Sequence, residues 1–357
     1  MKKKALIAMS GGVDSTVAAF LMKDEGYICQ GATLELLNTV LPKCCINNHD
    51  IEDARKIANQ LGFVHHTLDY SEIFQHEVVD YFVEAYETGL TPNPCVNCNR
   101  FLKFGKFLDY TLEQGFDYIV TGHYAQIEYN PTSHRYVLKK AKYLPKDQSY
   151  FLYGLTQEQL SHTLFPLGPL SKEEVRQIAA DHHFVTAGKK DSQDICFIKN
   201  GDYVSFLKQY TGKNYPSGDF IDTKGNVLGK HEGVVSYTIG QRKGLKIALG
   251  KPAYVVEKNT KTNTVTLGDC EDLLSKELIA NQFNWISIEH LNEPLKVFAK
   301  TRSTQKEQPA MAYPLEDGKV RIVFDDIQRA ITTGQSVVLY DGDYVVGGGI
   351  IVDVIRS

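Results

Sequence analysis

Apolar and polar positions along the first half of the chain fall into blocks that predict a repeated strand–helix pattern. Short apolar runs predict strands over residues 4–9, 27–36, 63–68 and 116–121. Between and after them, apolar residues at helical spacing predict helices over residues 16–25, 50–61, 73–87 and 101–114. This alternation predicts a doubly wound parallel α/β sheet, whose ligands bind beyond the carboxyl ends of the strands.

The pattern changes after Gly212, where glycines separate short β-rich runs. Before that point, a capping box at 171–174 predicts a helix to about 181, and 202–210 is a further short helix. Strong alternation near the C-terminus, with Asp341-Gly342 as a hairpin turn, predicts a β-barrel. We therefore expect a catalytic α/β domain at 1–205, a small β-rich central domain at 206–277 and a C-terminal barrel at 278–357.

The first predicted strand runs into Ser10-Gly11-Gly12-Val13-Asp14-Ser15 and then into a helix. Such a turn directs backbone N–H groups and the positive end of the helix at one point, which favours phosphate binding. The lysine of a GxxxxGK[ST] loop is missing, which argues against a kinase or GTPase. The segment SGGVDS instead resembles the pyrophosphate loop of ATP pyrophosphatases, with a chance Gly-Gly turn as the alternative. Gly122 and His123 follow another predicted strand, and His123 either contacts the nucleotide or hydrogen-bonds its own loop.

Composition narrows the class of protein. The 357 residues include no apolar run of membrane-spanning length, and seven cysteines without an export signal favour reduced thiols in the cytoplasm. The net charge of −4 gives no global signature of nucleic-acid binding. Lysines interleaved with tyrosines over 136–150 are either a solvated face or part of a groove that follows phosphates.

Two distant cysteine segments carry candidate sulfur chemistry. Cys95 and Cys98 form a CxxC pair after two prolines, and Cys98 is expected just before a helix, where the thiolate is favoured. Cys196 follows two lysines that would favour its thiolate if they fold against it. A redox pair, half of a zinc site, half of an iron–sulfur site and a nucleophile beside a spectator are open interpretations, although no second CxxC completes a zinc site. Four other cysteines are expected to be packing or bystander thiols: Cys29, Cys44, Cys45 and Cys270.

With these pieces assembled, the chain closely resembles the tRNA-specific 2-thiouridylases, the MnmA/TrmU family. The matching segments run in order over nearly the whole chain and include AMSGGVDS (8–15), TPNPCVNCNRFLKFG (91–105), TGHYA (121–125), KDQSYFLYGL (146–155), KKDSQDICFI (189–198), SYTIGQRKGL (236–245) and TGQSVVLYDGDYVVGGGII (333–351). The resemblance implies an ATP-pyrophosphatase-type domain, a small central domain and a C-terminal barrel. It also implies that ATP, with Mg²⁺, adenylates the C2 oxygen of a wobble uridine in tRNA. A persulfide sulfur, supplied by a donor protein, then replaces that oxygen to give 2-thiouridine, AMP and pyrophosphate.

The resemblance also assigns residues. Cys98 matches the nucleophile and Cys196 the persulfide carrier, roles that permit a transient disulfide between them. Asn93, Pro94 and Cys95 match contacts to the target base. The positions implied for ATP are Ala8, Met9, Ser10, Gly11, Gly12, Val13, Asp14, Ser15, Leu34 and Gly122. Those implied for tRNA are His123, Lys146, Asp147, Gln148, Arg302, Ser303 and Gln335.

Two departures from the family pattern matter. The family usually has Asp where this chain has Cys95, which puts proton transfer by that residue in doubt. Cys95, Cys98 and Cys196 could instead hold a [4Fe–4S] cluster with one iron open to carry sulfide. Ser303 stands where an aromatic residue is common, so its tRNA contact is expected to be weaker.

Two competing functions stay open at this stage. One is an amide-forming synthetase that uses ammonia and shares the SGGVDS loop. The other is a nucleotide-regulated RNA-binding protein whose cysteines are structural. Neither needs both Cys98 and Cys196 for a chemical step.

Overall fold

The computed structural model describes residues 2–37, 48–189 and 195–356. Cys44 and Cys45 lie outside the described residues. In the part of the chain that is described, no helix is both long and apolar enough to cross a membrane.

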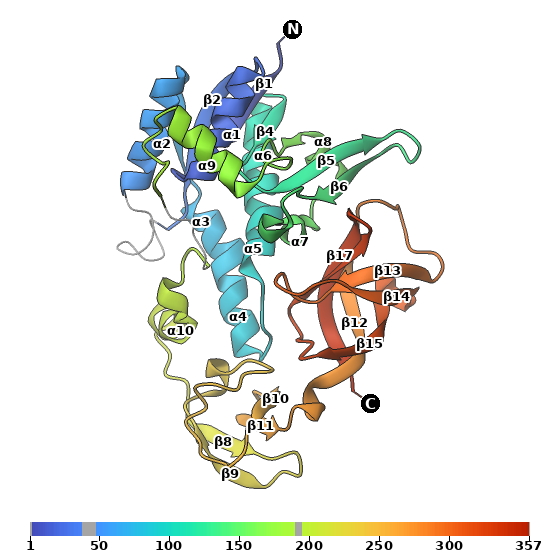
Figure 1. Cartoon of the computed structure of the whole chain (residues 1–357). Coiled ribbons are helices and arrows are strands. Elements are labelled where there is room, and N and C mark those ends of the chain that lie inside the picture. The colour runs from blue at the N-terminus through green and yellow to red at the C-terminus, as the bar shows by residue number, and fades with distance from the viewer. Residues whose placement is uncertain (1, 38–47, 190–194, 357) are drawn as a thin grey trace.

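A five-stranded parallel sheet forms the N-terminal half, as predicted (Figure 1). Its central strand has Leu6 between Gln30 and Ile119 of the neighbouring strands. Because this strand is covered on both faces, its sequence is almost continuously apolar. In spatial order the strands are β3 (His65–Asp69), β2 (Ile28–Glu35), β1 (Lys4–Ala8), β4 (Tyr118–Val120) and β7 (Thr163–Leu164).

Successive side chains of β1 face two hydrophobic layers. Ile7 packs in a cluster with residues of α1 (Val13–Asp24), α2 (Asn48–Leu61) and α9 (Lys172–Asp181). Leu6 lies in a second cluster with Phe104 and Phe107. The period-two alternation of the strand therefore builds a core on each face of the sheet.

Two predicted helices are longer and more irregular than their sequences indicated. The first is a run of α3 (Ser71–Phe74), the π-helix η1 (Gln75–Asp80) and α4 (Tyr81–Glu87). The second is a run of α5 (Pro94–Asn97), the π-helix η2 (Cys98–Lys106) and α6 (Phe107–Glu113). The prediction that Cys98 precedes this helix is wrong, because the helix begins at Pro94 and proline is well tolerated in a first helical turn.

The C-terminal half holds two further sheets. The central one contains, in spatial order, β10 (Tyr254–Asn259), β11 (Thr264–Gly268), β8 (Gly218–Ile221) and β9 (Val227–His231). The predicted barrel is confirmed, because β17 pairs back with β12 and closes the sheet. Its strands are β12 (Leu274–Trp285), β15 (Val320–Arg329), β14 (Gln308–Pro314), β13 (Leu295–Lys300), β16 (Ser336–Asp341) and β17 (Tyr344–Ile355).

A hairpin that the sequence did not predict joins the two halves. Its strands β5 (Ala125–Asn130) and β6 (Arg135–Lys140) leave the parallel sheet and extend the barrel sheet, with Lys139 opposite Tyr344 (Figure 1). The shorter elements are η3 (Leu144–Lys146), α7 (Ser149–Leu152), α8 (Gln157–Ser161), η4 (Lys199–Gly201), α10 (Tyr203–Thr211), η5 (Val234–Ser236), η6 (Glu271–Leu273) and η7 (Glu316–Gly318). The expected domain limits after residues 205 and 277 fall inside α10 and β12, and they stay a prediction.

Buried polar contacts hold the barrel against the N-terminal half. The Tyr150 hydroxyl donates to the Ser336 carbonyl at 2.8 Å, and the Ser336 hydroxyl donates to Tyr153 at 3.1 Å. The Gln335 side-chain amide donates to the Thr91 carbonyl at 2.8 Å, just before the CxxC pair. The barrel thus contacts the segment that carries Cys95 and Cys98.

Candidate active site

The SGGVDS loop joins β1 to α1 through a compact set of hydrogen bonds. The Ser15 hydroxyl accepts from the Ser10 backbone N–H and donates to the Gly12 carbonyl, both at 3.2 Å. Gly11 has φ +72°, and a Cβ there would lie 2.2 Å from the Asp50 carbonyl oxygen. Gly12 caps α1 without any side-chain hydrogen bond. The first turn of α1 therefore presents its backbone N–H groups without a side-chain cap, as an anion site requires.

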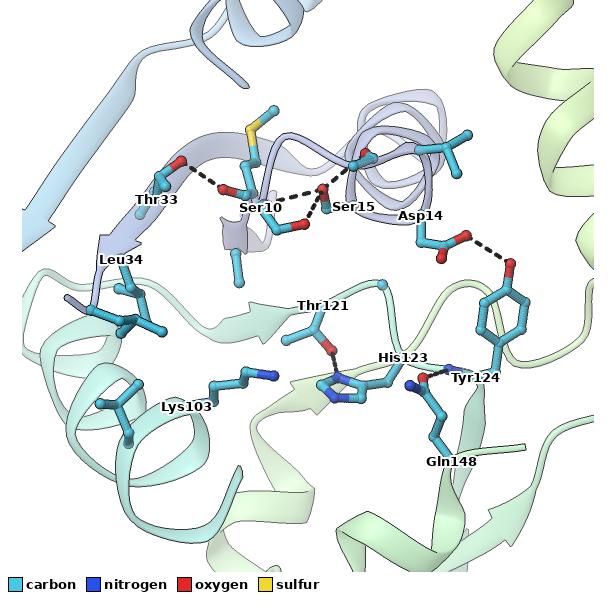
Figure 2. A pocket seen from close by; sticks show the side chains of 18 of the residues that line it. Ser10, Asp14, Ser15, Thr33, Leu34, Lys103, Thr121, His123, Tyr124 and Gln148 are labelled. Atoms are coloured by element: carbon cyan, nitrogen blue, oxygen red, sulfur yellow. Dashed lines mark hydrogen bonds between the residues drawn. The ribbon is translucent and has the colours of Figure 1, made fainter. Parts of the chain in front are cut away.

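A pocket of about 430 Å³ opens beside this loop, at the carboxyl ends of the central strands (Figure 2). Every position implied for ATP lines it except Gly11, which lies against Asp50. Leu34 comes from the end of β2, and Gly122 follows β4. The strand-end prediction therefore brings distant segments to one cavity.

His123 and Lys103 stand across the pocket from the loop (Figure 2). The Thr121 hydroxyl and His123 Nδ1 are hydrogen-bonded at 2.7 Å. Burial, with a smaller contribution from the Lys103 charge, holds the pKa of His123 well below its ordinary value. The histidine is therefore neutral near pH 7. It forms a hydrogen bond within its own loop and also lines the pocket, so the geometry is compatible with a loop-stabilising role and with a nucleotide contact.

Cys98 is a buried, free thiol, and its pKa is raised by burial. The expectation that the helix start favours its thiolate is therefore wrong, because desolvation outweighs it. The Lys103 charge acts in the opposite direction and lowers the pKa of Cys98. Cys95 is exposed. Burial raises the pKa of its thiol, and the Lys103 charge lowers that pKa by a smaller amount.

Cys196 is exposed and lies next to the hydrophobic cluster that contains Cys98. The two residues that follow it, Phe197 and Ile198, are buried in that cluster. Leu102 belongs to the same cluster and also lines the pocket beside the SGGVDS loop. The two cysteine segments and the pocket therefore share one body of packed side chains.

Two further lysines anchor the loop from outside the pocket. Lys172 is buried and donates to Asp14 at 2.7 Å, and Tyr124 donates to the same carboxylate oxygen at 2.8 Å. Lys189 donates to the Gly11 carbonyl at 2.9 Å and to Asp50 at 2.7 Å. Lys189 thus contacts these acceptors, which argues against its expected role beside the Cys196 thiol.

The positions implied for tRNA are divided between the pocket and the barrel. Lys146 and Gln148 line the pocket with His123, whereas Asp147 accepts hydrogen bonds from the Ala141 N–H and the Ser149 hydroxyl. The Arg302 guanidinium donates to the Ala330 carbonyl at 2.7 Å. Arg302 and Gln335 are thus both engaged in contacts within the chain.

The residues implied for the target base lie at the start of the Cys98 helix. Asn93 caps α5, Pro94 is the first helical residue, and Cys95 follows on the surface. Ser303 lies beyond the end of β13, on the barrel. Among the described residues, no group of three or more His, Cys, Asp or Glu side chains lies close enough together to hold a metal ion.

Five functional candidates were not identified from the sequence. Lys103, Thr33, Thr121 and Tyr124 line the pocket, and Lys172 holds Asp14. Thr121 and Tyr124 flank Gly122-His123, so their strand-end position was the available signal. Lys103 and Lys172 carried no such signal in the sequence. The position of Lys103 depends on a π-helical turn and that of Lys172 on a tertiary ion pair, and neither leaves a periodic pattern.

Comparison with known proteins gives consistent matches along the chain. Residues 3–200 match the family described as the tRNA methyl transferase HUP domain, residues 204–269 the tRNA methyl transferase PRC-barrel domain, and residues 275–351 the Aminomethyltransferase beta-barrel domain. The tRNA-specific 2-thiouridylase MnmA of Acetivibrio thermocellus is 51% identical over 356 residues, which cover 98% of this chain and 99% of the relative. The protein of the same name from Clostridioides difficile is 50% identical over 355 residues, covering 98% of each chain. The solved NMN synthetase of Francisella tularensis is 16% identical, with a TM-score of 0.36, covering 60% of this chain and 79% of that one.

Proposed function

This chain belongs to the tRNA-specific 2-thiouridylase family, and from that premise we propose that its pocket holds ATP while Cys98 and Cys196 pass sulfur to a tRNA uridine. The chain is a tRNA sulfurtransferase that uses ATP, and its reaction is tRNA 2-thiolation. One observation carries the residue assignment: Leu102 joins the nucleotide pocket to the hydrophobic cluster that contains Cys98 and the residues after Cys196.

ATP is the ligand that the pocket suits by position and chemistry. The uncapped start of α1 and the SGGVDS loop offer N–H donors for phosphate oxygens. Leu34 and Gly122 provide an apolar wall and a close backbone approach for the adenosine part. Mg²⁺ enters as part of the MgATP substrate, and Asp14 is the carboxylate that the pocket offers near it.

Adenylation solves the chemical difficulty of replacing a carbonyl oxygen. The C2 oxygen of the uracil attacks the α-phosphorus of ATP, the bond from that phosphorus to the bridging oxygen breaks, and pyrophosphate leaves with the electron pair. N3 of the base loses its proton in this step. The C2 oxygen now leaves as AMP, which is a far better leaving group than oxide.

Sulfur transfer then uses both cysteines in sequence. The terminal sulfur of a persulfide on Cys196 attacks C2, and AMP departs with the electron pair of the C2–O bond. The Cys98 thiolate next attacks Sγ of Cys196, which breaks the sulfur–sulfur bond and releases 2-thiouridine, whose N3 regains a proton. The resulting disulfide between the two cysteines is reset by a thiol reductant, and a persulfide donor protein reloads Cys196.

Substrate contacts follow the same residue-by-residue proposal. The wobble uridine leaves its stack to reach the pocket, where Asn93, Pro94 and Cys95 contact the base. His123, Lys146, Asp147 and Gln148 are proposed tRNA contacts near the pocket. Arg302, Ser303 and Gln335 are the proposed contacts on the barrel. Because tRNA and reduced thiols are found in the cytoplasm, we place the reaction there.

An iron–sulfur cluster on Cys95, Cys98 and Cys196 is the alternative form of this chemistry. The arrangement of the described residues does not fit one, since no three potential ligands among them converge. No step is therefore derived through a cluster. We expect anaerobically purified protein to be colourless and free of iron and to tolerate Cys95→Asp, whereas brown protein with about four irons per chain would assign the three cysteines to a cluster.

A matched set of cysteine variants tests the proposal. Each variant is loaded with a persulfide donor, ATP and unmodified tRNA, and both 2-thiouridine and pyrophosphate are measured. We expect Cys98→Ser and Cys196→Ser to form less than about 1% of the product, while Cys270→Ser, outside the site, keeps full activity. Substantial 2-thiouridine from either active-site variant would overturn the assignment, and pyrophosphate without thiolation in the parent chain would favour another ATP-dependent synthetase.

A further inference from the structure

Lys103 occupies a position in the pocket that the assigned roles do not use. It lies on η2, one π-turn after Cys98, and its side chain lines the cavity opposite the SGGVDS loop. Figure 2 shows the side chain reaching into this space with its ammonium end directed toward His123. A lysine on a helix packed into the core is thereby aimed at the place where the nucleotide is proposed to bind.

The positive charge of Lys103 has no counter-ion among the residues that the structure describes. No hydrogen bond or ion pair links it to any of them. The lysines around the loop differ in this respect, because Lys172 is held by Asp14 and Lys189 by Asp50. A half-buried cation that lines a pocket without a carboxylate partner is suited to an anionic ligand.

The nucleotide loop itself lacks a cation that would complete the phosphate site. SGGVDS contains no lysine or arginine, so its own contribution is limited to backbone N–H groups and serine hydroxyls. A triphosphate carries several negative charges, and phosphoryl transfer is accelerated by positive charge at the reacting phosphoryl group. Lys103 can supply that charge from the opposite wall.

The position of Lys103 also selects which phosphate it meets. Its charge acts on Cys95, Cys98 and His123, so it lies near the thiols as well as the nucleotide pocket. Sulfur must arrive at the carbon whose oxygen carries the α-phosphoryl group. With sulfur arriving from the thiols, the α-phosphoryl group would lie between the loop and the thiols, where Lys103 is found, and the β- and γ-phosphates would extend toward the start of α1.

We propose that Lys103 is a catalytic residue whose ammonium group binds the α-phosphoryl group of ATP, and afterwards that of the AMP on the base. This proposal rests on the proposed function of the same pocket. Lys103 neutralises the charge that builds on the non-bridging oxygens as the C2 oxygen attacks and pyrophosphate leaves. It then stabilises AMP as the C2–O bond breaks, so the same ammonium serves both steps without giving up a proton.

Three variants of one helix test the proposal. Lys103→Met removes the charge at nearly constant length, and Lys103→Arg keeps it. Lys106→Met is the matched control, because Lys106 lies on the same π-helix but is exposed and paired with Asp109. Single-turnover assays follow tRNA-dependent pyrophosphate release and 2-thiouridine, and circular dichroism checks that each variant is folded.

We expect Lys103→Met to slow pyrophosphate release at saturating ATP by about 100-fold or more, and Lys103→Arg to be at least tenfold faster than Lys103→Met. Lys106→Met should match the parent chain. Pyrophosphate release by Lys103→Met within threefold of the parent would overturn the proposal, as would a loss confined to sulfur transfer. Should Lys103→Met not fold, Lys103→Gln replaces it with the same expected loss, and pyrophosphate release within threefold of the parent would again overturn the proposal.

Cys98→Ser, measured in parallel, separates this proposal from the proposed function. That variant should still release pyrophosphate while forming no 2-thiouridine, because adenylation precedes its step. If it forms 2-thiouridine, the sulfur assignment fails whatever Lys103 does. If only the Lys103 variants behave like the parent, the sulfur assignment stands and the role of Lys103 fails.

Discussion

Burial and charge act on the Cys98 thiol in opposite directions, and burial is the larger of the two. Desolvation raises its pKa above the ordinary value of 9.0, while Lys103 lowers it. At neutral pH the side chain is therefore mainly the thiol, and the nucleophilic thiolate is a minor form. The reaction of Cys98 with an electrophile should consequently gain rate as the pH rises.

This balance predicts a pH profile for alkylation of Cys98. From pH 7 to pH 8.5 the rate of alkylation by iodoacetamide should rise about tenfold per pH unit, without a plateau, because the thiolate fraction grows in that proportion below the pKa. Peptide mass spectrometry resolves Cys98 from the other cysteines, and N-acetylcysteine serves as the solvated reference. A plateau below pH 8 would mean that the thiolate is favoured at this site.

Gly122 allows the strand end to approach the nucleotide loop closely. A Cβ at this position would lie 2.8 Å from both the Asp14 carbonyl carbon and the Ser15 nitrogen, which are backbone atoms. We expect Gly122→Ala to displace the start of α1 and to weaken ATP binding by at least about tenfold, measured by calorimetry. Gly188→Ala is the control, since no atom lies within 4 Å of the added methyl group. Equal ATP affinity in the two variants would show that the loop is not held at this contact.

At the residue scale, the sequence identified the loop and the cysteines but missed their supporting charges. The loop and Gly122-His123 were accessible because both follow apolar strands of a parallel sheet. The role of Lys103 could not be predicted from the sequence, because its closeness to Cys98 depends on a π-helical turn. The raised pKa of Cys98 follows from its burial in a cluster that also contains Phe74 and Phe197, which come from distant segments.

At the scale of elements, an ion pair joins the start of α9 to α1, beside the hydrophobic cluster that the two helices share. Lys172, at the start of α9, donates to Asp14 in the first turn of α1. Removing the Lys172 ammonium leaves the Asp14 carboxylate without the positive charge that stabilises it. The loop that contains Asp14 is then held less firmly.

Lys172→Met is therefore expected to lower the midpoint of thermal unfolding by about 4 °C. Glu173→Gln, an exposed change on the same helix that keeps a hydrogen-bond acceptor, should leave the midpoint within about 1 °C. Differential scanning fluorimetry of the two variants makes the comparison. If Lys172→Met unfolds at the parent temperature, the ion pair does not contribute to holding α9.

Element prediction succeeded where burial on two faces enforced an apolar run. The strands β1, β2 and β4 were predicted close to their observed limits. The helix that begins at Pro94 was predicted to start too late, because prolines in TPNP also suit an extended segment. The β5–β6 hairpin was not predicted, since β5 is largely exposed and β6 pairs with the barrel at one position, Lys139 opposite Tyr344.

At the scale of the whole molecule, the barrel holds the segment that leads to the cysteine pair. The Gln335 amide donates to the Thr91 and Pro92 carbonyls, and the Thr91 N–H donates to the Thr333 carbonyl at 3.0 Å. These bonds fix the backbone just before Asn93 and Cys95. The barrel therefore holds the segment before the proposed sulfur-transfer site, and no barrel residue is among those that line the pocket.

Gln335→Ala should consequently reduce the rate of thiolation by about tenfold while leaving ATP affinity unchanged. Gln308→Ala is the control on β14 of the barrel, where the half-buried side chain donates to the nearby Lys306 carbonyl at 3.3 Å. A fall in ATP affinity for Gln335→Ala would instead indicate that the barrel acts through the nucleotide pocket.

The sequence indicated a parallel sheet, a β-rich centre and a barrel because local alternation and glycine spacing distinguish them. It did not indicate that barrel residues would form hydrogen bonds with Tyr150 and with the segment before the CxxC pair. Such contacts join positions nearly 200 or more residues apart and depend on shape complementarity, which one sequence does not encode locally.

Cys98 and Cys196 are proposed to meet beside the nucleotide and to complete one sulfur transfer. The most direct test of this proposal is a single turnover of persulfide-loaded enzyme with ATP and tRNA, without reductant, followed by rapid alkylation and peptide mass spectrometry. One Cys98–Cys196 disulfide should form for each 2-thiouridine. Formation of 2-thiouridine while both cysteines remain open to alkylation would contradict it.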